Sequence, residues 1–254
     1  MSHSLATLIR DLRLKRGRER RGLALAEGIR LVEEALAARM AIRHVLSGPA
    51  LETTPRGRTL KAALAAAGYA IETVPEKEFM TLAATDEPQG ILAVIEPKQW
   101  TLDDLHPGPR SPLLVLDAVQ DPGNVGTMVR TAFALGAAGV IALPGTAELT
   151  NPKTLRATMG GAFRLPYLSL DEAAFRNWAR DKGVKVLIAA AGGTAVAGFR
   201  GAILAVVVGN EGAGVRPSLD GWADGRVGIP IRDGAESLNV GVAAGILLHE
   251  VTRG

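Results

Sequence analysis

The chain has 254 residues, 47% hydrophobic and 22% charged, a balance that indicates a globular protein of one large or two medium domains. It contains no cysteine, which excludes disulfides, thiolate catalysis and cysteine zinc sites, and its four scattered histidines lack metal-ligand spacing. No N-terminal signal core and no apolar run near the ~20 residues of a membrane helix is visible, so a cytoplasmic protein with neither metal nor membrane segment is expected.

The net charge of +3 is unevenly distributed, because arginine and lysine are concentrated in RDLRLKRGRERRG near the N-terminus. Such a cluster is typical of nucleic-acid binding, although a solvated, arginine-rich helix face is an equally open interpretation. Aromatic residues make up 4% of the chain, which disfavours recognition by rows of base-stacking rings. The candidate RNA-binding residues of this cluster are Arg13, Lys15, Arg16, Arg18, Arg20 and Arg21.

The first part of the chain alternates helical and strand-like segments. Periodicity predicts a helix at the centre of residues 22–39, a strand at 42–48, a helix at 57–69 and strands at 70–75 and 90–96. These segments indicate a small α/β domain over residues 1–97. A proline-rich linker without apolar periodicity follows at residues 98–111, and a second domain is expected at residues 112–254.

The second domain contains short, continuous apolar runs that begin at residues 113, 139, 184, 202 and 226. Helices are predicted between and after them, at residues 124–135, 152–159, 171–182 and 237–252. Strands without period-two alternation, interleaved with helices, indicate a parallel sheet that is covered on both faces. Ligands of such sheets bind beyond the carboxyl ends of the strands, so the segments after the strands are the candidate site.

Two of these segments are glycine-containing turns. After the first strand, VQDPGNVGTMVRTAFALGA contains Asn124, which can cap a helix, and Arg130 six residues later; a plain turn with a surface arginine would look the same. After the fourth strand, NEGAGVRP contains Glu211 among glycines that allow close backbone approach. Its spacing is neither the dinucleotide fingerprint nor a phosphate-binding loop.

The third segment, RDGAESLNVG, follows the last strand and leads into the final helix. Ser237 and Asn239 lie at the predicted start of that helix, where a capping role alone would explain them. The helix contains Gly241, Ala244 and Gly245, small residues at helical spacing that weaken a free helix. They would allow a neighbouring backbone to come very close.

Together, QDPGNVGTMVRTAFALGA, VVVGNEGAGV and IPIRDGAESLNVGVAAGILLHE resemble the three ordered motifs of the SpoU branch of SPOUT-class RNA methyltransferases. The resemblance extends from about residue 113 to 251. In the first half, AEGIRLVEEALAA and QGILAVIE resemble the ribosomal-protein-like domain that many members place before the catalytic domain to hold RNA.

The resemblance implies transfer of a methyl group from S-adenosylmethionine to a ribose 2′-hydroxyl of RNA. It also implies an α/β catalytic domain whose parallel sheet contains a deep trefoil knot, and a homodimer with the cofactor pocket near the interface. The motif positions that correspond to the family's catalytic set are Asn124, Arg130, Glu211, Ser237 and Asn239. The implied cofactor-binding residues are Ala189, Ala190, Ala191, Gly192, Gly209, Asn210, Glu211, Gly212, Ile229, Ile231 and Leu238. Further RNA contacts are expected from Lys153, Arg156 and Arg164.

The roles of these side chains follow from their chemistry. Family accounts assign removal of the hydroxyl proton to Arg130, but a guanidinium stays protonated, so phosphate binding and stabilisation of developing negative charge is the alternative role. Asn124 is expected to orient the ribose or Arg130. Glu211 is expected to order an arginine or a loop, because an ordinary glutamate pKa near ~4.3 makes it a weak general base.

Several alternatives stay open. Structured ribosomal RNA is favoured as the substrate over transfer RNA, and a non-catalytic RNA-binding or ribosome-assembly factor is the non-enzymatic alternative. A nucleotide-binding oxidoreductase is disfavoured, because the fingerprint after the first strand is absent and Asp117 and Asp121 are not where its ribose-binding acid would be.

Overall fold

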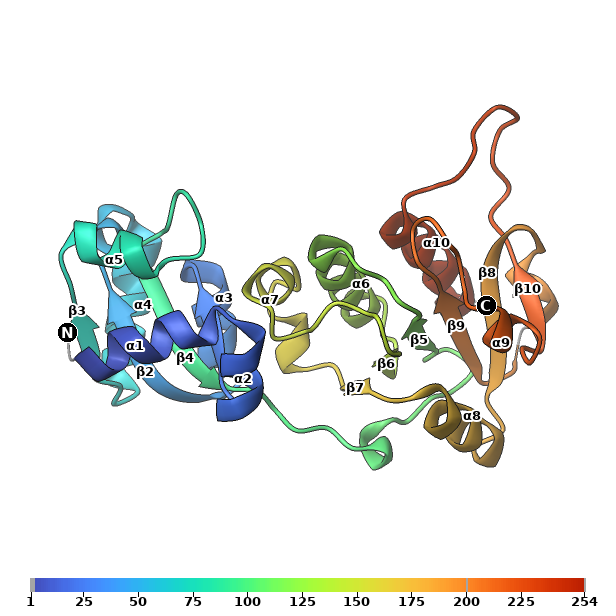
Figure 1. Ribbon diagram of the computed structural model, residues 1–254, viewed down its shortest axis with the longest axis horizontal. Coiled ribbons are helices and arrows are strands. Elements are labelled where there is room, and N and C mark those ends of the chain that lie inside the picture. The colour runs from blue at the N-terminus through green and yellow to red at the C-terminus, as the bar shows by residue number, and fades with distance from the viewer. Residues whose placement is uncertain (1–2, 200, 254) are drawn as a thin grey trace. The chain divides into compact units, whose positions relative to one another are not determined.

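The computed structural model describes residues 3–199 and 201–253, and the chain divides into two compact units. The first unit holds residues 1–99 together with 150–163, and the second holds residues 100–149 together with 164–254. Each unit has its own sheet and its own buried core (Figure 1). None of the helices in the described ranges has the length and hydropathy that crossing a membrane requires.

The first unit is built on a four-stranded sheet in the order β1-β4-β2-β3, in which β4 runs antiparallel to β1 and β2 while β2 and β3 are parallel. Apolar side chains of α1, α5 and the sheet form one buried cluster, with Ile9, Phe79 and Leu92 almost fully covered. Its strands are β1 Ala24–Glu27, β2 Ala41–Ser47, β3 Ile71–Thr73 and β4 Ile91–Glu96. Its helices are α1 His3–Leu12, α2 Lys15–Arg21, α3 Ile29–Ala37, η1 Pro49–Thr53, α4 Pro55–Ala66, α5 Glu76–Leu82, α7 Pro152–Ala157 and η3 Gly161–Phe163.

The second unit contains a six-stranded sheet in the order β10-β8-β9-β5-β6-β7, and every neighbouring pair is parallel. The predicted parallel α/β sheet is therefore confirmed. Its strands are β5 Leu113–Leu116, β6 Gly139–Ala142, β7 Tyr167–Ser169, β8 Lys185–Thr194, β9 Leu204–Val208 and β10 Gly225–Val227. Its helices are η2 Leu102–Asp104, α6 Pro122–Ala134, α8 Glu172–Asp181, η4 Val196–Phe199, α9 Pro217–Asp220 and α10 Val240–Arg253.

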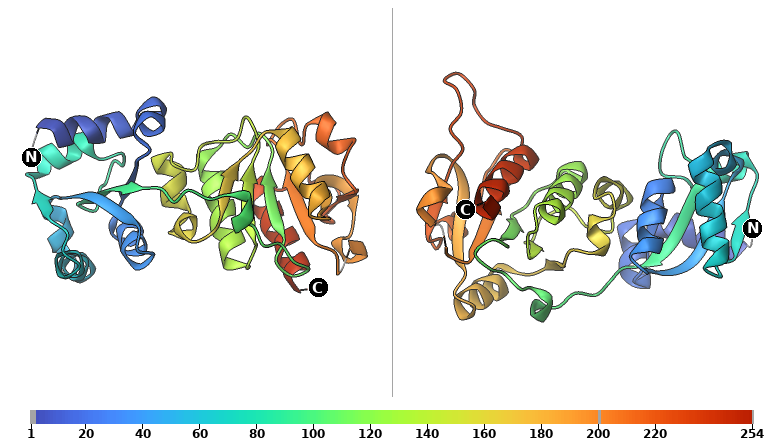
Figure 2. Two further views of the ribbon diagram at one scale, coloured as in Figure 1. Left: turned by 90° about the horizontal axis from the view of Figure 1, so that it is seen from below. Right: turned by 180° about the vertical axis from the view of Figure 1, so that it is seen from behind.

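Both faces of this sheet are buried, which explains why its strands read as continuous apolar runs. On β8, Val186 and Ile188 pack in the cluster that includes Phe175 of α8, while Leu187 packs on the other face with Leu247 of α10. Successive residues of a strand point to opposite faces, so a strand covered on both sides needs apolar residues at every position. Figure 2 shows α6 and α10 side by side, and α10 contacts β9 while α6 contacts β6.

Helix α10 begins at Val240, three residues later than the sequence predicts, because residues 228–239 form an exposed loop after β10. Asn239 caps the helix: its Oδ1 accepts hydrogen bonds from the backbone amides of Gly241 at 2.9 Å and Val242 at 3.3 Å. The glycines of α10 face α6, since a Cβ built on Gly245 would lie 3.3 Å from Cγ2 of Thr131. Close helix packing therefore accounts for the small residues.

Candidate active site

The carboxyl ends of the central strands bring together three of the five predicted motif residues. Asn124 at the start of α6 donates from Nδ2 to Oε1 of Glu211 at 3.0 Å. Asn239 donates from its own Nδ2 to Oδ1 of Asn124 at 3.2 Å. Residues that are 87 and 115 positions apart in the chain thus form one continuous chain of hydrogen bonds.

Asn124 can make these bonds because another residue caps its helix. Asp121 is the N-cap of α6, and its Oδ1 accepts a hydrogen bond from the backbone amide of Asn124 at 2.7 Å. Pro122 occupies the first helical position, where a missing amide hydrogen is harmless. The sequence interpretation of Asn124 as a possible cap is therefore corrected, and its side-chain amide is left for Glu211 and Asn239.

The carboxylate of Glu211 is held in its charged form. Partial burial acts to raise the pKa of Glu211, but the hydrogen bonds from Asn124 and from nearby backbone amides outweigh it, so the pKa lies below its ordinary value. A carboxylate that is ionised throughout the neutral range is a good hydrogen-bond acceptor and a weak proton acceptor. The geometry therefore agrees with an ordering role.

Arg130 and Ser237 lie outside this hydrogen-bonded chain. Arg130 is six residues after Asn124 on α6, about 9 Å along the helix axis and on a different face. Its side chain is exposed and makes no hydrogen bond or ion pair within the described ranges. Ser237 is on the exposed loop three residues before α10, so it does not cap the helix, and it lines a cavity at the ends of the strands.

A cavity of about 400 Å³ lies beside the hydrogen-bonded chain, between the ends of β8, β9 and β10, the loop 228–239 and α10. Gly192 and Gly212, predicted as cofactor-binding residues, are outside its lining. The other predicted cofactor-binding residues all line it: Ala189, Ala190, Ala191, Gly209, Asn210, Glu211, Ile229, Ile231 and Leu238. The sequence interpretation missed several lining residues: Gly214, Val227, Gly228, Glu236, Val240, Ala243 and Leu247.

Two glycine pairs let backbone approach backbone at this cavity. A Cβ built on Gly209 would lie 2.1 Å from the carbonyl carbon of Gly214, and one built on Gly228 would lie 2.7 Å from the amide nitrogen of Gly193. No side chain fits at either crossing, so main-chain amides and carbonyls form part of the wall. The volume is within the range of small-molecule sites.

Asn210 uses its side chain to hold the loop after β9 in place. Its Nδ2 donates to the carbonyl oxygen of Ala118 at 3.1 Å, and its Oδ1 accepts from the amides of Gly212 and Ala213 at 3.0 Å each. Because both the Nδ2 and the Oδ1 of its side chain already form hydrogen bonds within the protein, Asn210 can contact a ligand through its main chain.

An ion pair between buried Asp117 and partly buried Arg216 joins this loop to the end of β5. Asp117, at the carboxyl end of β5, is 1% exposed and accepts hydrogen bonds from the backbone amide of Arg216 at 2.7 Å and from its Nε at 2.6 Å. The bond to Asp117 raises the pKa of the Arg216 guanidinium. The sequence interpretation considered Asp117 only as a nucleotide-binding acid and missed this ion pair. The signal that could have indicated it is an aspartate directly after a fully apolar strand.

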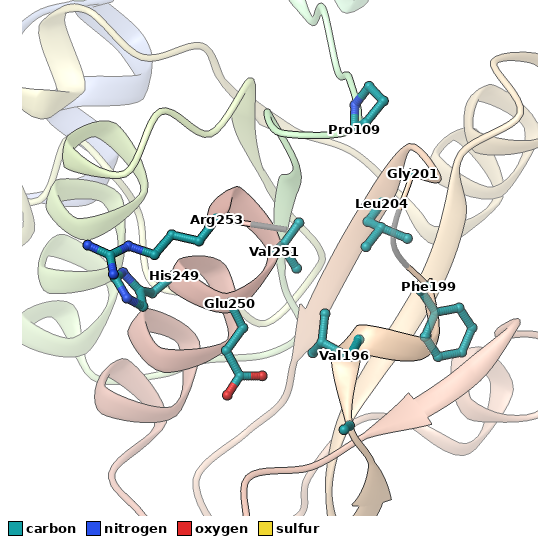
Figure 3. A pocket seen from close by; sticks show the side chains of 11 residues that line it. Pro109, Val196, Phe199, Gly201, Leu204, His249, Glu250, Val251 and Arg253 are labelled. Carbon is teal, nitrogen blue, oxygen red and sulfur yellow. The ribbon is translucent and has the colours of Figure 1, made fainter.

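A second cavity of about 410 Å³ lies elsewhere in the same unit (Figure 3). Val196, Phe199 and Leu204 border it on one side and His249 and Arg253 of α10 on the other. None of the five candidate catalytic side chains lines it. The two cavities are therefore similar in volume and differ in the side chains that border them. Across the described chain, no group of three or more histidine and acidic side chains is placed to hold a metal ion.

The basic segment near the N-terminus is partly structural. Arg18 is 5% exposed and its NH1 donates to the carbonyl oxygens of Leu12 at 3.1 Å and Arg13 at 3.0 Å, which fixes the turn between α1 and α2. Arg20 and Arg21 both bind the carboxylate of Asp11, at 2.8 and 2.5 Å. The other members, Arg13, Lys15 and Arg16, are exposed, as is Lys153, while Arg156 and Arg164 are partly buried.

A wholly parallel sheet whose carboxyl-end loops join Asn124, Glu211 and Asn239 beside a cavity walled by main chain defines an α/β enzyme of the SPOUT methyltransferase class. Residues 111–249 match the model of the SpoU rRNA Methylase family, and residues 7–93 match the MRM3-like substrate binding domain. The chain belongs to the SpoU rRNA methylase family. The predicted family and the predicted order of the two domains are confirmed.

Similar proteins share this organisation over nearly the whole chain. The 23S rRNA (guanosine(2553)-2′-O)-methyltransferase RlmP of Bacillus subtilis (strain 168) is 34% identical over 249 residues, 95% of this chain and 93% of that protein. The AdoMet-bound rRNA methyltransferase of Sinorhizobium meliloti has a TM-score of 0.86 at 32% identity, covering 99% of this chain and 95% of that chain. The SpoU methyltransferase AviRb of Streptomyces viridochromogenes, in complex with AdoMet, has a TM-score of 0.86 at 25% identity, covering 100% and 98%.

Proposed function

We propose that this protein transfers the methyl group of S-adenosylmethionine to a ribose 2′-hydroxyl of ribosomal RNA. The observation that carries the proposal is the hydrogen-bonded chain of Asn124, Glu211 and Asn239 at the edge of the glycine-walled cavity. The proposal is supported by relatives that are named as rRNA methyltransferases and match both units of the chain. The intact set of motif side chains favours this enzyme over a non-catalytic RNA-binding factor.

The cavity fits S-adenosylmethionine in size and in the character of its walls. Backbone amides and carbonyls at Gly209, Gly214 and Gly228 can bond the polar edge of a nucleoside, while Ile229 and Leu238 offer apolar contact. When bound there, the cofactor supplies an electrophilic methyl carbon on a sulfonium centre. The chain's own contribution is position and electrostatics.

The RNA side of the reaction needs a hydroxyl that becomes more nucleophilic as its proton leaves. The exposed guanidinium of Arg130 is suited to bind an RNA phosphate and to stabilise the negative charge that develops on the 2′-oxygen. Asn124 and Asn239, fixed by Glu211, orient the ribose, and Ser237 shapes the edge of the cavity. Water or phosphate oxygen completes proton removal, because Glu211 is held ionised and weakly basic.

The two domains divide the work in this proposal. Residues 1–97 hold structured RNA, residues 98–111 connect the two domains, and residues 112–254 transfer the methyl group, although residues 100–111 fold with the second unit and residues 150–163 with the first. The exposed cations Arg13, Lys15, Arg16 and Lys153 meet RNA phosphates. Ribosomal RNA is proposed ahead of transfer RNA, because two of the relatives that span both units are named for ribosomal RNA alone.

The proposal includes a cytoplasmic homodimer with a knotted catalytic domain. Phe133 on α6 and Val242 on α10 are 41% and 52% exposed, and exposed apolar side chains on two adjacent helices suit a second copy of the chain. The close backbone crossings at the Gly209–Gly214 and Gly193–Gly228 pairs support a tightly threaded carboxyl-terminal part.

The testing experiment is incubation of the protein with labelled S-adenosylmethionine and either ribosomal or transfer RNA, followed by mapping of the methylated nucleotide. We expect a ribose 2′-O-methyl group at one position of ribosomal RNA. The matched control is Arg130→Ala, which is expected to bind the cofactor normally and to transfer no methyl group. Methylation of a base, of transfer RNA alone, or normal turnover by the variant would contradict the proposal.

A further inference from the structure

The loop after β9, residues 209–216, is fastened to the end of β5 at two points. Asn210 donates to the carbonyl oxygen of Ala118, and six residues later Arg216 binds Asp117 through both its backbone amide and its guanidinium. Arg216 also donates from NH2 to the carbonyl oxygen of Pro144 at 2.8 Å, beyond the end of β6. One side chain therefore joins the segments that follow three strands.

The Asp117–Arg216 pair is the stronger of the two attachments. Asp117 is 1% exposed, and the bonds it accepts come from a charged donor and a backbone amide with good geometry at 2.6 and 2.7 Å. A buried carboxylate has few other ways to satisfy its charge, so it strongly restricts where Arg216 can lie. Glu172 also faces Arg216, at 3.7 Å from NH1.

The segment that this pair restrains carries the site. Glu211, which receives the bond from Asn124, is five residues before Arg216 in the same loop. The main chain at Gly209 and Gly214 forms one wall of the cavity, and the two backbones approach so closely that no side chain fits between them. Asp117 and Arg216 themselves do not line the cavity.

We propose that Asp117 and Arg216 are positioning residues for methyl transfer. The pair of buried Asp117 and partly buried Arg216 fixes loop 209–216, so that Glu211 meets Asn124 and the main chain at Gly209 and Gly214 forms a wall of the cofactor cavity. The expected effect on kcat rests on the proposed function. The expected effect on cofactor affinity rests only on the cavity being the cofactor site.

The test compares Asp117→Asn with a matched control in the same sheet. Asp224 also accepts one bond from a basic side chain, Lys185 Nζ at 2.7 Å, and one from a backbone amide, Val186 at 2.9 Å. It lies at the amino end of β8, away from the loops that carry the site. Asp224→Asn therefore removes a similar charge without touching loop 209–216. Arg216→Lys is the milder second variant, which keeps the positive charge beside Asp117.

The measurements are melting temperature, the Kd for S-adenosylmethionine by calorimetry, and kcat and KM with RNA. Asp117→Asn is expected to raise the cofactor Kd at least about fivefold and to lower kcat at least about tenfold, with the RNA KM within about twofold. Arg216→Lys is expected to raise the cofactor Kd and to lower kcat by about threefold each. Asp224→Asn is expected to change neither the cofactor Kd nor kcat by more than about twofold.

The inference is overturned if folded Asp117→Asn and Arg216→Lys proteins keep both constants within twofold, or if Asp224→Asn impairs them equally. If Asp117→Asn does not fold, Arg216→Lys alone decides the outcome. A failure of the proposed function looks different: the unaltered protein would then methylate no ribose, while the calorimetric comparison of the variants would still test the positioning role.

Discussion

At the scale of single residues, the site depends on which polar side chains form hydrogen bonds with one another. Asp121 caps α6, and this leaves the Asn124 amide to bridge Glu211 and Asn239. Asn239 serves two purposes at once, since its Oδ1 caps α10 while its Nδ2 donates to Asn124. A helix start beside a strand end allows one side chain to meet both needs.

The lowered pKa of Glu211 leads to a prediction about its role. Glu211→Gln is expected to keep at least about a third of kcat, because the amide oxygen still accepts the bond from Asn124, whereas Glu211→Ala is expected to lose more than about tenfold. Because the folded pKa lies below the ordinary value, the carboxylate stays ionised as pH falls through the weakly acid range, and its stabilising contribution is lost only as pH falls through that lowered pKa.

The measurement is kcat of both variants and of the unaltered protein between about pH 5 and 8. A flat profile in that range for Glu211→Gln and the unaltered protein is expected. A large loss in Glu211→Gln, with a pH dependence that disappears in this variant alone, would identify Glu211 as a general base and contradict an ordering role.

At the scale of elements, the pairing of α6 and α10 explains the final helix. Gly245 faces Thr131 and Gly241 faces Thr127 and Met128, so packing between helices compensates for weak helix propensity. The exposed Val242 and Phe133 lie on the same two helices.

Gly245→Leu is expected to lower stability by about 1–3 kcal/mol, because its Cβ alone would lie 3.3 Å from Thr131 Cγ2 and the larger branch has no space. The proposed homodimer is expected to weaken as α10 shifts. Thermal unfolding and light scattering measure the two effects. Glu250→Leu puts the same side chain on an exposed position of α10 and is expected to change stability by less than about 0.5 kcal/mol. Equal behaviour of the two variants would refute the packing argument.

Two strands were not predicted, and their lengths explain why. Ala24–Glu27 has four residues directly before α3, and its apolar character merges with the helical pattern. Tyr167–Ser169 has three residues at the edge of the second sheet and pairs only with β6. Segments this short carry no measurable period, so pairing with a neighbouring strand decides their conformation.

At the scale of the whole molecule, RNA binding is expected to be electrostatic, with affinity that falls steeply as salt increases. Arg16 is exposed and Arg18 is buried against carbonyl oxygens, which provides a matched pair two residues apart. Arg16→Ala is expected to reduce the slope of log affinity against log salt by about 1. Arg18→Ala is expected to lower the melting temperature and to leave the slope of the remaining folded protein unchanged.

Filter binding or fluorescence anisotropy across a salt series measures these slopes. A salt-independent affinity for the unaltered protein would rule out phosphate contacts as the main source of RNA binding. Equal slope changes in both variants would show that the exposure of Arg16 does not distinguish it from Arg18.

The sequence by itself determined the alternation of helices and strands, most strands of the buried parallel sheet and the three motif segments, because apolar periodicity and turn chemistry are local properties. The resemblance to the SpoU family also placed nine of the cavity-lining residues, but it missed the lining glycines Gly214 and Gly228. Only the tertiary structure decided that Asp121 rather than Asn124 caps α6, that Arg18 is structural while Arg16 is exposed, and that Asp117 binds Arg216 beneath the site. These hydrogen bonds depend on which of several chemically equivalent donors and acceptors come within about 3 Å of each other. Asp117 and Arg216 are 99 positions apart in the chain, so they come into contact only after it has folded.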